Sequence, residues 1–230
     1  MSYIEVSELS KAFSDKNVLD HFSMDLKRNE VLGVIGHNGA GKTTLFKLIL
    51  QMYTPDSGEI KINDESFDLK NDVGYLPEQR GLFAKTDVYS QLLAFGYLKG
   101  KSKEDLQPNI EFWLDFFSVE DYKREIVANL SKGNQQKIQF MTAVIHNPKL
   151  LILDEPFSGL DPINVDLFID AIDYMKEEGC SIIYSSHQLD SIEHLSDRLL
   201  FIKGGKKIYL DYLENIKEQY GYRLKLRMIP

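Results

Sequence analysis

The chain has 230 residues, of which 43% are hydrophobic and 27% are charged, and its formal net charge is −8. This composition excludes a disordered chain, and the length allows one α/β domain but not two NTPase domains. The acidic balance argues against a nucleic acid partner, and the single cysteine excludes an internal disulfide and fits a reducing compartment.

The start of the chain shows no export signal. Residues 1–5 contain no cationic segment followed by an apolar run, so we expect no secretory signal peptide. The sequence also lacks a run of about 18 consecutive apolar residues, which a membrane-spanning helix needs. The expected location is therefore the cytoplasm, unless a partner holds the protein at a membrane.

Short strands are predicted in the first third of the chain. Apolar or alternating runs occur at residues 4–6, 22–26, 31–35, 59–62 and 72–76. Runs of this length and pattern are typical of β-strands. The domain is therefore expected to begin with β structure.

Residues 36–43 read Gly-His-Asn-Gly-Ala-Gly-Lys-Thr, which matches the complete G-x-x-x-x-G-K-[ST] phosphate-binding loop. Its glycines let backbone N–H groups surround an anion, and the helix predicted at residues 44–50 adds a positive dipole. Lys42 is expected to reach the β- and γ-phosphates, and the Thr43 hydroxyl to ligate Mg²⁺. The loop predicts a nucleoside triphosphate site. The residues expected at the nucleotide are Gly36, His37, Asn38, Gly39, Ala40, Gly41, Lys42, Thr43 and Thr44.

The middle of the chain has a helical pattern from about residue 86 to residue 146. Ile110, Trp113, Leu114 and Phe117 follow the i, i+3, i+4, i+7 spacing of one helix face, whereas residues 99–108 are expected to form a polar connector. The many aromatic residues here fit two interpretations, the core of a small helical subdomain or a docking surface, and we favour the core.

The last third alternates strands and helices. Residues 150–153 are wholly apolar, as expected of a parallel strand buried on both faces. A helix is predicted to begin near Pro162, and strands are predicted at residues 181–184, 199–202 and 207–210. A short helix is also expected at residues 189–196. Residues 222–228 alternate basic and apolar side chains, which fits either an edge strand or the start of a further segment.

Two carboxylates, Asp154 and Glu155, follow the apolar run at residues 150–153. Many strands end in solvated acids, so the pair alone is a weak signal. Together with the phosphate-binding loop, however, it predicts that Asp154 holds Mg²⁺ through its water shell and that Glu155 polarises an attacking water molecule.

Further motifs point to a family. Residues 130–136, Leu-Ser-Lys-Gly-Asn-Gln-Gln, resemble the LSGGQ signature of ATP-binding-cassette (ABC) ATPases. Residues 156–162 resemble the loop that follows the Walker B strand in that family, and residues 185–187 resemble its switch histidine. Because these motifs occur in the order and at the spacing typical of the family, the chain resembles the ABC ATPases.

The resemblance implies an α/β fold. Its P-loop NTPase (RecA-like) core would carry an N-terminal antiparallel β subdomain and an inserted helical subdomain. Residues 1–85 and 147–230 would form the nucleotide-binding core with the β subdomain, and residues 86–146 the helical subdomain with the signature.

The resemblance also implies further site residues. His187 would join Glu155 as a catalytic residue, and the ring of Phe13 would stack on adenine. Ser131, Gly133 and Gln135 of the signature would contact the nucleotide. Taken alone, Phe13 fits a core or turn aromatic and His187 a surface histidine, while Ser131 predicts a helix N-cap, which is compatible with phosphate binding.

The sequence departs from the family pattern at two places. Glu78 occupies the position at which the family usually has a glutamine near Mg²⁺, and Gln79 follows it. Both remain candidates for that role, and we favour Glu78. Lys132 and Asn134 also depart from the signature. Both departures resemble the branch of bacterial ATPase subunits that serve sodium, drug and antibiotic-peptide exporters.

The resemblance implies that two such subunits pair head to tail around ATP, as a homodimer or a heterodimer. A separate integral membrane permease would dock near residues 78–97, which would place the protein on the inner face of the membrane. The predicted function is ATP hydrolysis that powers transport, in the direction of export.

The alternative is a non-transport ABC ATPase acting on DNA or the ribosome. It is disfavoured because the interval between Lys42 and Asp154 has no room for a long coiled coil and the chain holds one cassette. A regulatory subunit that only binds nucleotide is disfavoured because Lys42, Asp154, Glu155 and His187 are all present.

Overall fold

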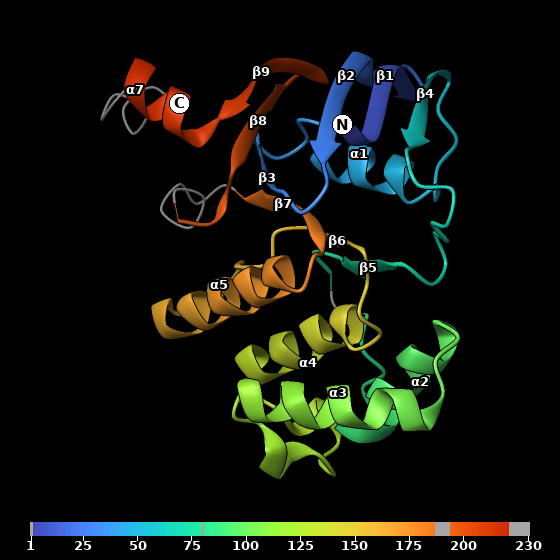
Figure 1. Ribbon diagram of the computed structural model, residues 1–230, viewed down its shortest axis with the longest axis vertical. Helices are drawn as coiled ribbons and strands as arrows, with labels where there is room; N and C mark the ends of the chain where they lie inside the picture. Colours follow the sequence, from blue (N-terminus) through green and yellow to red (C-terminus); the bar gives the residue numbers. More distant parts are fainter. Residues whose placement is uncertain (1, 80, 187–193, 221–230) are drawn as a thin grey trace.

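The computed structural model describes residues 2–79, 81–186 and 194–220 (Figure 1). Two β-sheets organise the chain. The smaller sheet is antiparallel and three-stranded, in the order β2 (Lys16–Lys27), β1 (Ser2–Phe13) and β4 (Ser57–Ile62). The larger sheet is six-stranded, in the order β5 (Val73–Leu76), β6 (Leu150–Leu153), β7 (Ser181–Ser186), β3 (Val31–Ile35), β8 (Arg198–Lys203) and β9 (Lys206–Tyr212).

The larger sheet is parallel from β5 to β8, and only β9 runs antiparallel to its neighbour. Parallel strands end at the same edge of a sheet, so β3, β5, β6 and β7 end along one edge, where the segments after β3, β5 and β6 start. Helix α7 (Leu213–Tyr220) follows β9. This topology brings together the phosphate-binding loop and the acidic pair Asp154 and Glu155.

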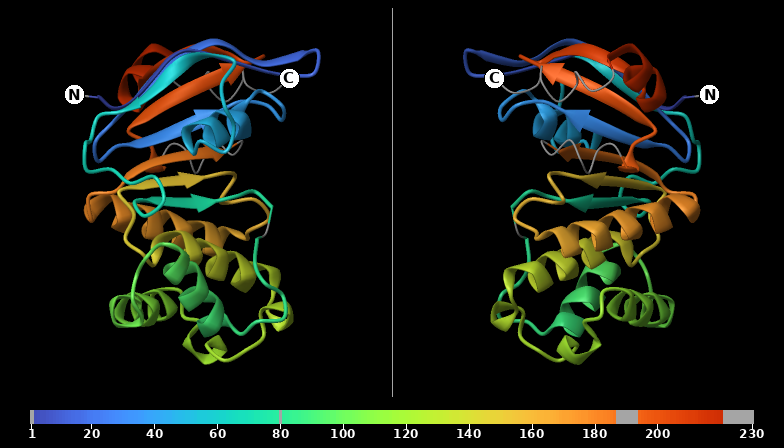
Figure 2. Two further views of the ribbon diagram at one scale, coloured as in Figure 1. Left: turned by 90° about the vertical axis from the view of Figure 1, so that its right-hand side faces the viewer. Right: turned by 90° about the vertical axis from the view of Figure 1, so that its left-hand side faces the viewer.

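The protein has two apolar cores, one on each face of the larger sheet. Helix α1 (Lys42–Ile49) lies between the two sheets (Figure 1), and its buried Leu45 and Phe46 pack with apolar residues of both. The opposite face is covered by α5 (Pro162–Glu177) and α4 (Lys132–Val144), as the side views show (Figure 2). A strand buried on both faces needs an apolar sequence, which explains why β6 is wholly apolar.

Helices α2 (Val88–Leu98) and α3 (Lys103–Phe116) complete the helical end of the molecule, together with short 3₁₀ turns at Glu120–Tyr122 and Val127–Asn129. The predicted stripe on α3 is confirmed, since Ile110, Trp113 and Leu114 are buried. Trp113 also contacts Tyr174 of α5, with the ring centroids 5.6 Å apart. The preference for a core over a docking surface holds for Trp113 but not for Tyr97, which is 50% exposed.

The predicted polar connector at residues 99–108 is wrong in its second half, because α3 begins at Lys103. Ser102 and Asp105 form a capping box, in which each side chain accepts a hydrogen bond from the backbone N–H of the other. Pro108 lies inside the helix and removes one N–H donor. The cap and the buried stripe together outweigh that loss.

The elements predicted in the last third of the chain are only partly covered by the described residues. The strand predicted at residues 181–184 extends to Ser186, and its residues 182–186 pair with β3. The helix predicted at residues 189–196 falls largely, and the segment 222–228 wholly, outside the described residues. Within the ranges that the structure describes, no helix has the length and apolarity needed to cross a membrane.

Buried His146 makes the stability of this fold depend on pH. Its Nε2 donates a hydrogen bond to the Val73 carbonyl at 3.0 Å. Burial and the nearby Lys99 ammonium lower its pKa from 6.5 to about 4. The neutral ring therefore stabilises the fold fully above about pH 6.5, and this contribution is lost as the pH falls towards the folded pKa.

We predict that His146→Gln lowers the pH sensitivity of the free energy of unfolding. Between about pH 7 and about pH 5 the wild type should lose about 2 kcal/mol more than the variant, because each unit of pKa shift corresponds to about 1.4 kcal/mol. Urea titrations at both pH values measure this difference. His21→Gln is the control, since the His21 side chain is 71% exposed. An equal loss in wild type and His146→Gln would contradict the prediction.

Candidate functional site

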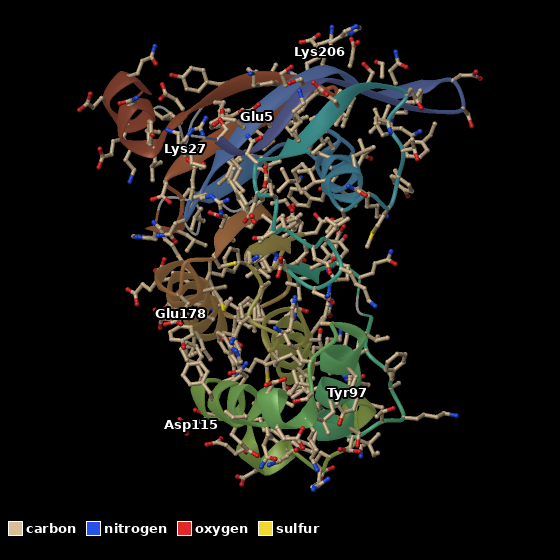
Figure 3. All side chains as sticks on the ribbon, turned by 45° about the vertical axis from the view of Figure 1, so that its right-hand side comes forward. Glu5, Lys27, Tyr97, Asp115, Glu178 and Lys206 are labelled. Atoms are coloured by element: carbon tan, nitrogen blue, oxygen red, sulfur yellow. The ribbon has the colours of Figure 1, made fainter. Side chains whose placement is uncertain are left out.

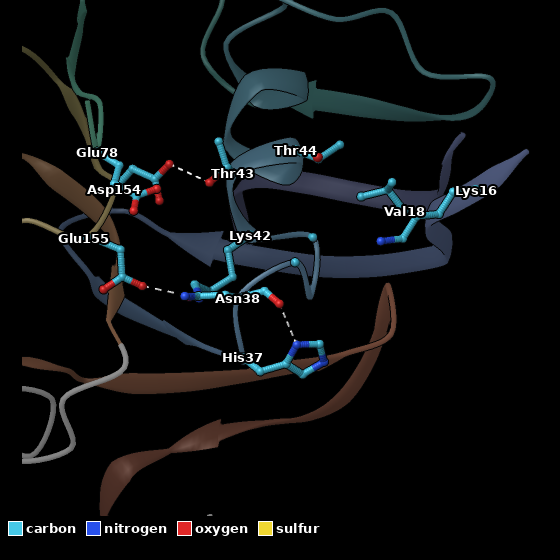
Figure 4. A pocket seen from close by; sticks show the side chains of 12 residues that line it. Lys16, Val18, His37, Asn38, Lys42, Thr43, Thr44, Glu78, Asp154 and Glu155 are labelled. Carbon is cyan, nitrogen blue, oxygen red and sulfur yellow. Dashed lines mark hydrogen bonds and ion pairs between the residues drawn. The ribbon is translucent and has the colours of Figure 1, made fainter. Parts of the chain in front are cut away.

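A cavity of about 360 Å³ opens at the edge of the larger sheet where its parallel strands end (Figure 4). Its walls come from the β1–β2 hairpin, the loop between β3 and α1, and the segments that follow β5 and β6. The lining residues are Lys16, Val18, His37, Asn38, Gly39, Gly41, Lys42, Thr43, Thr44, Glu78, Asp154 and Glu155. The fold thus brings together the phosphate-binding loop and the acidic pair, which are far apart in the sequence.

The glycines of the loop are needed for different physical reasons. Gly39 and Gly41 have φ angles of 80° and 113°, in the left-handed region that favours glycine. A Cβ on Gly41 would also lie 2.9 Å from the Val18 carbonyl oxygen, and one on Gly36 would lie 2.6 Å from that of Ile202. Gly41 occupies the N-cap position of α1, with no side chain to cover the first backbone N–H groups. The loop therefore offers these N–H groups to an anion.

Lys42 points back across the loop. Its Nζ donates a hydrogen bond to the Gly36 carbonyl at 2.6 Å and lies 3.3 Å from Oε1 of Glu155. Both side chains are buried, with 6% of Lys42 and 8% of Glu155 exposed. Figure 4 shows the two side chains approaching from opposite walls. A buried ammonium and a buried carboxylate stabilise each other here, because neither has bulk water.

A chain of hydrogen bonds fixes Asp154. The Thr43 hydroxyl donates to its Oδ2 at 2.7 Å, and the Ser185 hydroxyl donates to its Oδ1 at 2.8 Å. Asp154 is only 1% exposed. These contacts hold the carboxylate in one orientation, with Oδ2 beside the Thr43 hydroxyl at the cavity.

Glu155 adopts an unusual backbone conformation. Its φ angle is 52°, which is rare for a residue other than glycine. The Glu155 N–H donates to the Ser185 hydroxyl at 2.9 Å, and its carbonyl accepts from the Ser158 N–H at 3.1 Å. The chain thus turns sharply after β6, and the Glu155 carboxylate reaches the cavity.

The sequence reasoning missed Lys16 and Val18, which come from the β1–β2 hairpin. No local motif marks them. The one hint is the glycine at position 41, which the hairpin approaches closely. Phe13, predicted at the adenine, does not line the cavity, although it is 40% exposed; its ring contacts Tyr53 edge-on at 5.2 Å.

The signature residues lie apart from the cavity, at the start of α4. Ser131 is the N-cap, as predicted, and its hydroxyl accepts the Asn134 N–H at 3.2 Å. Gln135 donates to the Val127 and Leu130 carbonyls at 3.0 and 3.1 Å. The described residues that line the cavity also exclude Gly36, Ala40, Gln79 and Gly133. His187, predicted as a catalytic residue, lies outside the described residues.

The close approach at Gly41 predicts a stability difference inside one loop. Gly41→Ala should lower the free energy of unfolding by about 2–3 kcal/mol, because the new Cβ adds an overlap with Val18 to an unfavourable φ. Gly39→Ala is the matched control, since its φ is also positive but its Cβ would meet no atom within 4 Å. It should cost only about 1 kcal/mol. Urea unfolding of both variants decides the matter, and equal losses would contradict the prediction.

Comparison with known proteins gives consistent matches. The family model for ABC transporter proteins matches residues 19–158. The chain is 44% identical over 219 residues to an uncharacterized ABC transporter ATP-binding protein of Methanocaldococcus jannaschii, covering 95% of this chain and 81% of the relative. A solved ATP-binding subunit of an ABC transporter superposes with a TM-score of 0.89 at 28% identity, covering 100% of both chains. The structure of cbiO1 from Clostridium perfringens gives 0.82 at 27% identity, covering 99% of this chain and 95% of cbiO1.

These matches confirm the expected fold and the expected family. The relative extends over almost the whole chain, and the phosphate-binding loop, the signature and the acidic pair fall inside the range of the family model. Proteins of this family are ATPases that power transport. The chain is therefore an ATPase, and it belongs to the ATP-binding subunits of ABC transporters.

Proposed function

We propose that the protein hydrolyses ATP in the cavity between the 36–44 loop and the segment after β6, and that it drives export through a separate membrane permease. One observation carries the proposal. Thr43 and Lys42 of the loop each contact one member of the acidic pair, Thr43 at Asp154 (2.7 Å) and Lys42 at Glu155 (3.3 Å). The phosphate-binding and water-activating groups therefore face the same space.

Lys42 is proposed to bind the β- and γ-phosphates. Its Nζ makes contacts with Gly36 and Glu155, which phosphate oxygens would replace. As Lys42 turns to the phosphates, the Glu155 carboxylate loses its cationic neighbour and becomes available to accept a hydrogen bond from water. Glu155 then orients that water for in-line attack on the γ-phosphate. His187 is proposed to contact the same phosphate.

The residues also fit Mg²⁺. Among the described residues, no group of three or more His, Cys, Asp or Glu side chains is placed to hold a metal. Mg²⁺ typically binds one or two carboxylates together with substrate phosphates, and the Thr43 and Asp154 oxygens are hard ligands only 2.7 Å apart. We propose that these two residues hold Mg²⁺, which when bound neutralises charge on the phosphates. Glu78 lines the same cavity, and this supports Glu78 over Gln79 as the further residue near Mg²⁺.

A second subunit is proposed to complete the site. Ser131, Gly133 and Gln135 lie at the start of α4, away from the cavity of their own chain, and therefore need the nucleotide of another chain. The N-terminus of α4 offers backbone N–H groups and a positive dipole to phosphate. Phe13, exposed at the β1–β2 hairpin, is proposed to stack on adenine.

The permease is proposed to dock on the helical subdomain, which we assign to residues 86–146, and on the loop before it. Phe83, Tyr97 and Leu98 are 53%, 50% and 64% exposed, which is unusual for large apolar side chains. Tyr97 lies at the outer surface of α2 (Figure 3). The related cbiO1 is described as part of the transporter complex cbiONQ. Export as the direction rests on the exporter-like signature with Lys132 and Asn134.

We predict that Glu155→Gln abolishes steady-state ATP hydrolysis but retains ATP binding. The amide keeps the shape of the side chain but loses the charge that orients water, so kcat should fall by at least about 100-fold. Lys42→Ala is the contrasting variant, because it should weaken nucleotide binding itself. Isothermal titration separates the two effects. Turnover by Glu155→Gln at the wild-type rate would remove Glu155 from the proposed role.

We also predict ATP-dependent association. Glu155→Gln protein should be monomeric without nucleotide and dimeric with Mg-ATP in sedimentation velocity. Adding Ser131→Arg should block the dimer without harming ATP binding, because the bulk lies at the partner's phosphates. Ser102→Arg on the same background is the control, since Ser102 caps α3 in the same manner. A dimer that persists with Ser131→Arg would exclude the signature from the interface, and a monomer with Glu155→Gln alone would favour a heterodimer.

A further inference from the structure

Ser185 joins the two buried carboxylates of the site through one hydroxyl group. It lies near the end of β7 and is 0% exposed. Its Oγ donates to Oδ1 of Asp154 at 2.8 Å and accepts the backbone N–H of Glu155 at 2.9 Å. The hydroxyl proton and an oxygen lone pair are thus both used, each on a different residue of the acidic pair.

The bond to Glu155 acts on a strained point of the backbone. Glu155 has a φ angle of 52°, a conformation that persists in a residue other than glycine only where its surroundings enforce it. The Ser185 oxygen accepts the N–H of this same residue. It therefore helps to set the direction in which the Glu155 side chain leaves the strand, and hence the place of its carboxylate.

The bond to Asp154 acts on a side chain. It occupies Oδ1 and leaves Oδ2 towards the Thr43 hydroxyl, which lies 2.7 Å away. Groups that hydrogen-bond to a metal ligand fix its orientation and commonly matter for metal affinity and activity. Without the Ser185 hydroxyl, the Thr43 hydroxyl would provide the one remaining described hydrogen bond that orients the Asp154 carboxylate.

We infer that Ser185 is a positioning residue for ATP hydrolysis, which locks the distance and angle between the metal-binding Asp154 and the catalytic Glu155. This inference rests on the proposed function, because the roles of the two carboxylates are those proposed above. Ser185 touches neither nucleotide nor water in this role. It acts through its two neighbours.

The same strand provides a matched control. Ser181 lies on the same face of β7 as Ser185, because residues separated by an even number share a face. It is 2% exposed, and its hydroxyl accepts the backbone N–H of Asn29 at 2.9 Å. Asn29 also has a positive φ angle, 54°. Ser181 therefore makes the same kind of bond to the same kind of backbone at the opposite end of the strand from the cavity.

The test compares Ser185→Ala with Ser181→Ala in the full chain. Both should lower the midpoint of thermal unfolding to a similar degree. Only Ser185→Ala should lower kcat, by about 10- to 100-fold. A readout independent of turnover is the affinity for a non-hydrolysable ATP analogue with Mg²⁺ and with EDTA. The gain in affinity that Mg²⁺ provides should shrink about tenfold in Ser185→Ala and stay unchanged in Ser181→Ala.

Ser185→Cys separates the hydrogen bonds from the packing, because the thiol fills the same space but is a weak donor and acceptor. It should behave as Ser185→Ala does, and it decides the question if the alanine variant does not fold. Wild-type kcat and wild-type Mg²⁺ dependence in a folded Ser185 variant would overturn the inference and leave Ser185 a structural residue. Failure of the proposed function is recognised separately, because Glu155→Gln would then retain turnover whatever Ser185 does.

Discussion

Asp154 and Glu155 place two neighbouring carboxylates inside the protein, only 1% and 8% exposed, where unpaired charges are costly. The rest of the site follows from this constraint. Asp154 is satisfied by two hydroxyl donors, one from α1 and one from β7, while Glu155 faces the Lys42 ammonium. Segments that contribute these partners must converge, and their convergence defines the cavity. The negative charge that the chemistry requires thus also holds the segments of the site together.

The parallel sheet makes this convergence possible. Strands β3, β6 and β7 are neighbours in the sheet, and each contributes one or two members of the network at or beyond its end. β3 leads into Lys42 and Thr43, β6 into Asp154 and Glu155, and β7 contains Ser185. Because these strands are buried on both faces, their relative positions are fixed by packing and do not depend on a ligand.

The sequence predicted those parts of the protein that have a local pattern. The apolar run of β6 and the glycine loop each carry enough information within a few residues to identify a buried strand and a phosphate site. The predictions failed where distant segments meet. Ser185 was noted only as a neighbour of the switch histidine, because nothing next to it shows that its hydroxyl reaches Asp154. The polar connector predicted at residues 99–108 was wrong in its second half, because the burial that stabilises α3 comes from other helices.

The glycines at positions 36, 41 and 205 are required by the packing of the backbone, whether or not a nucleotide binds. Each lies against a backbone carbonyl of another strand, with added Cβ atoms at 2.6, 2.9 and 2.4 Å from Ile202, Val18 and Val18 respectively. These contacts are between backbones, so no substitution in the neighbouring strand would relieve them. A descendant that had lost all affinity for nucleotide would still be selected to keep these glycines as long as it kept this fold. In such proteins the glycine spacing would report on the architecture, whereas Lys42 and the acidic pair would report on the chemistry.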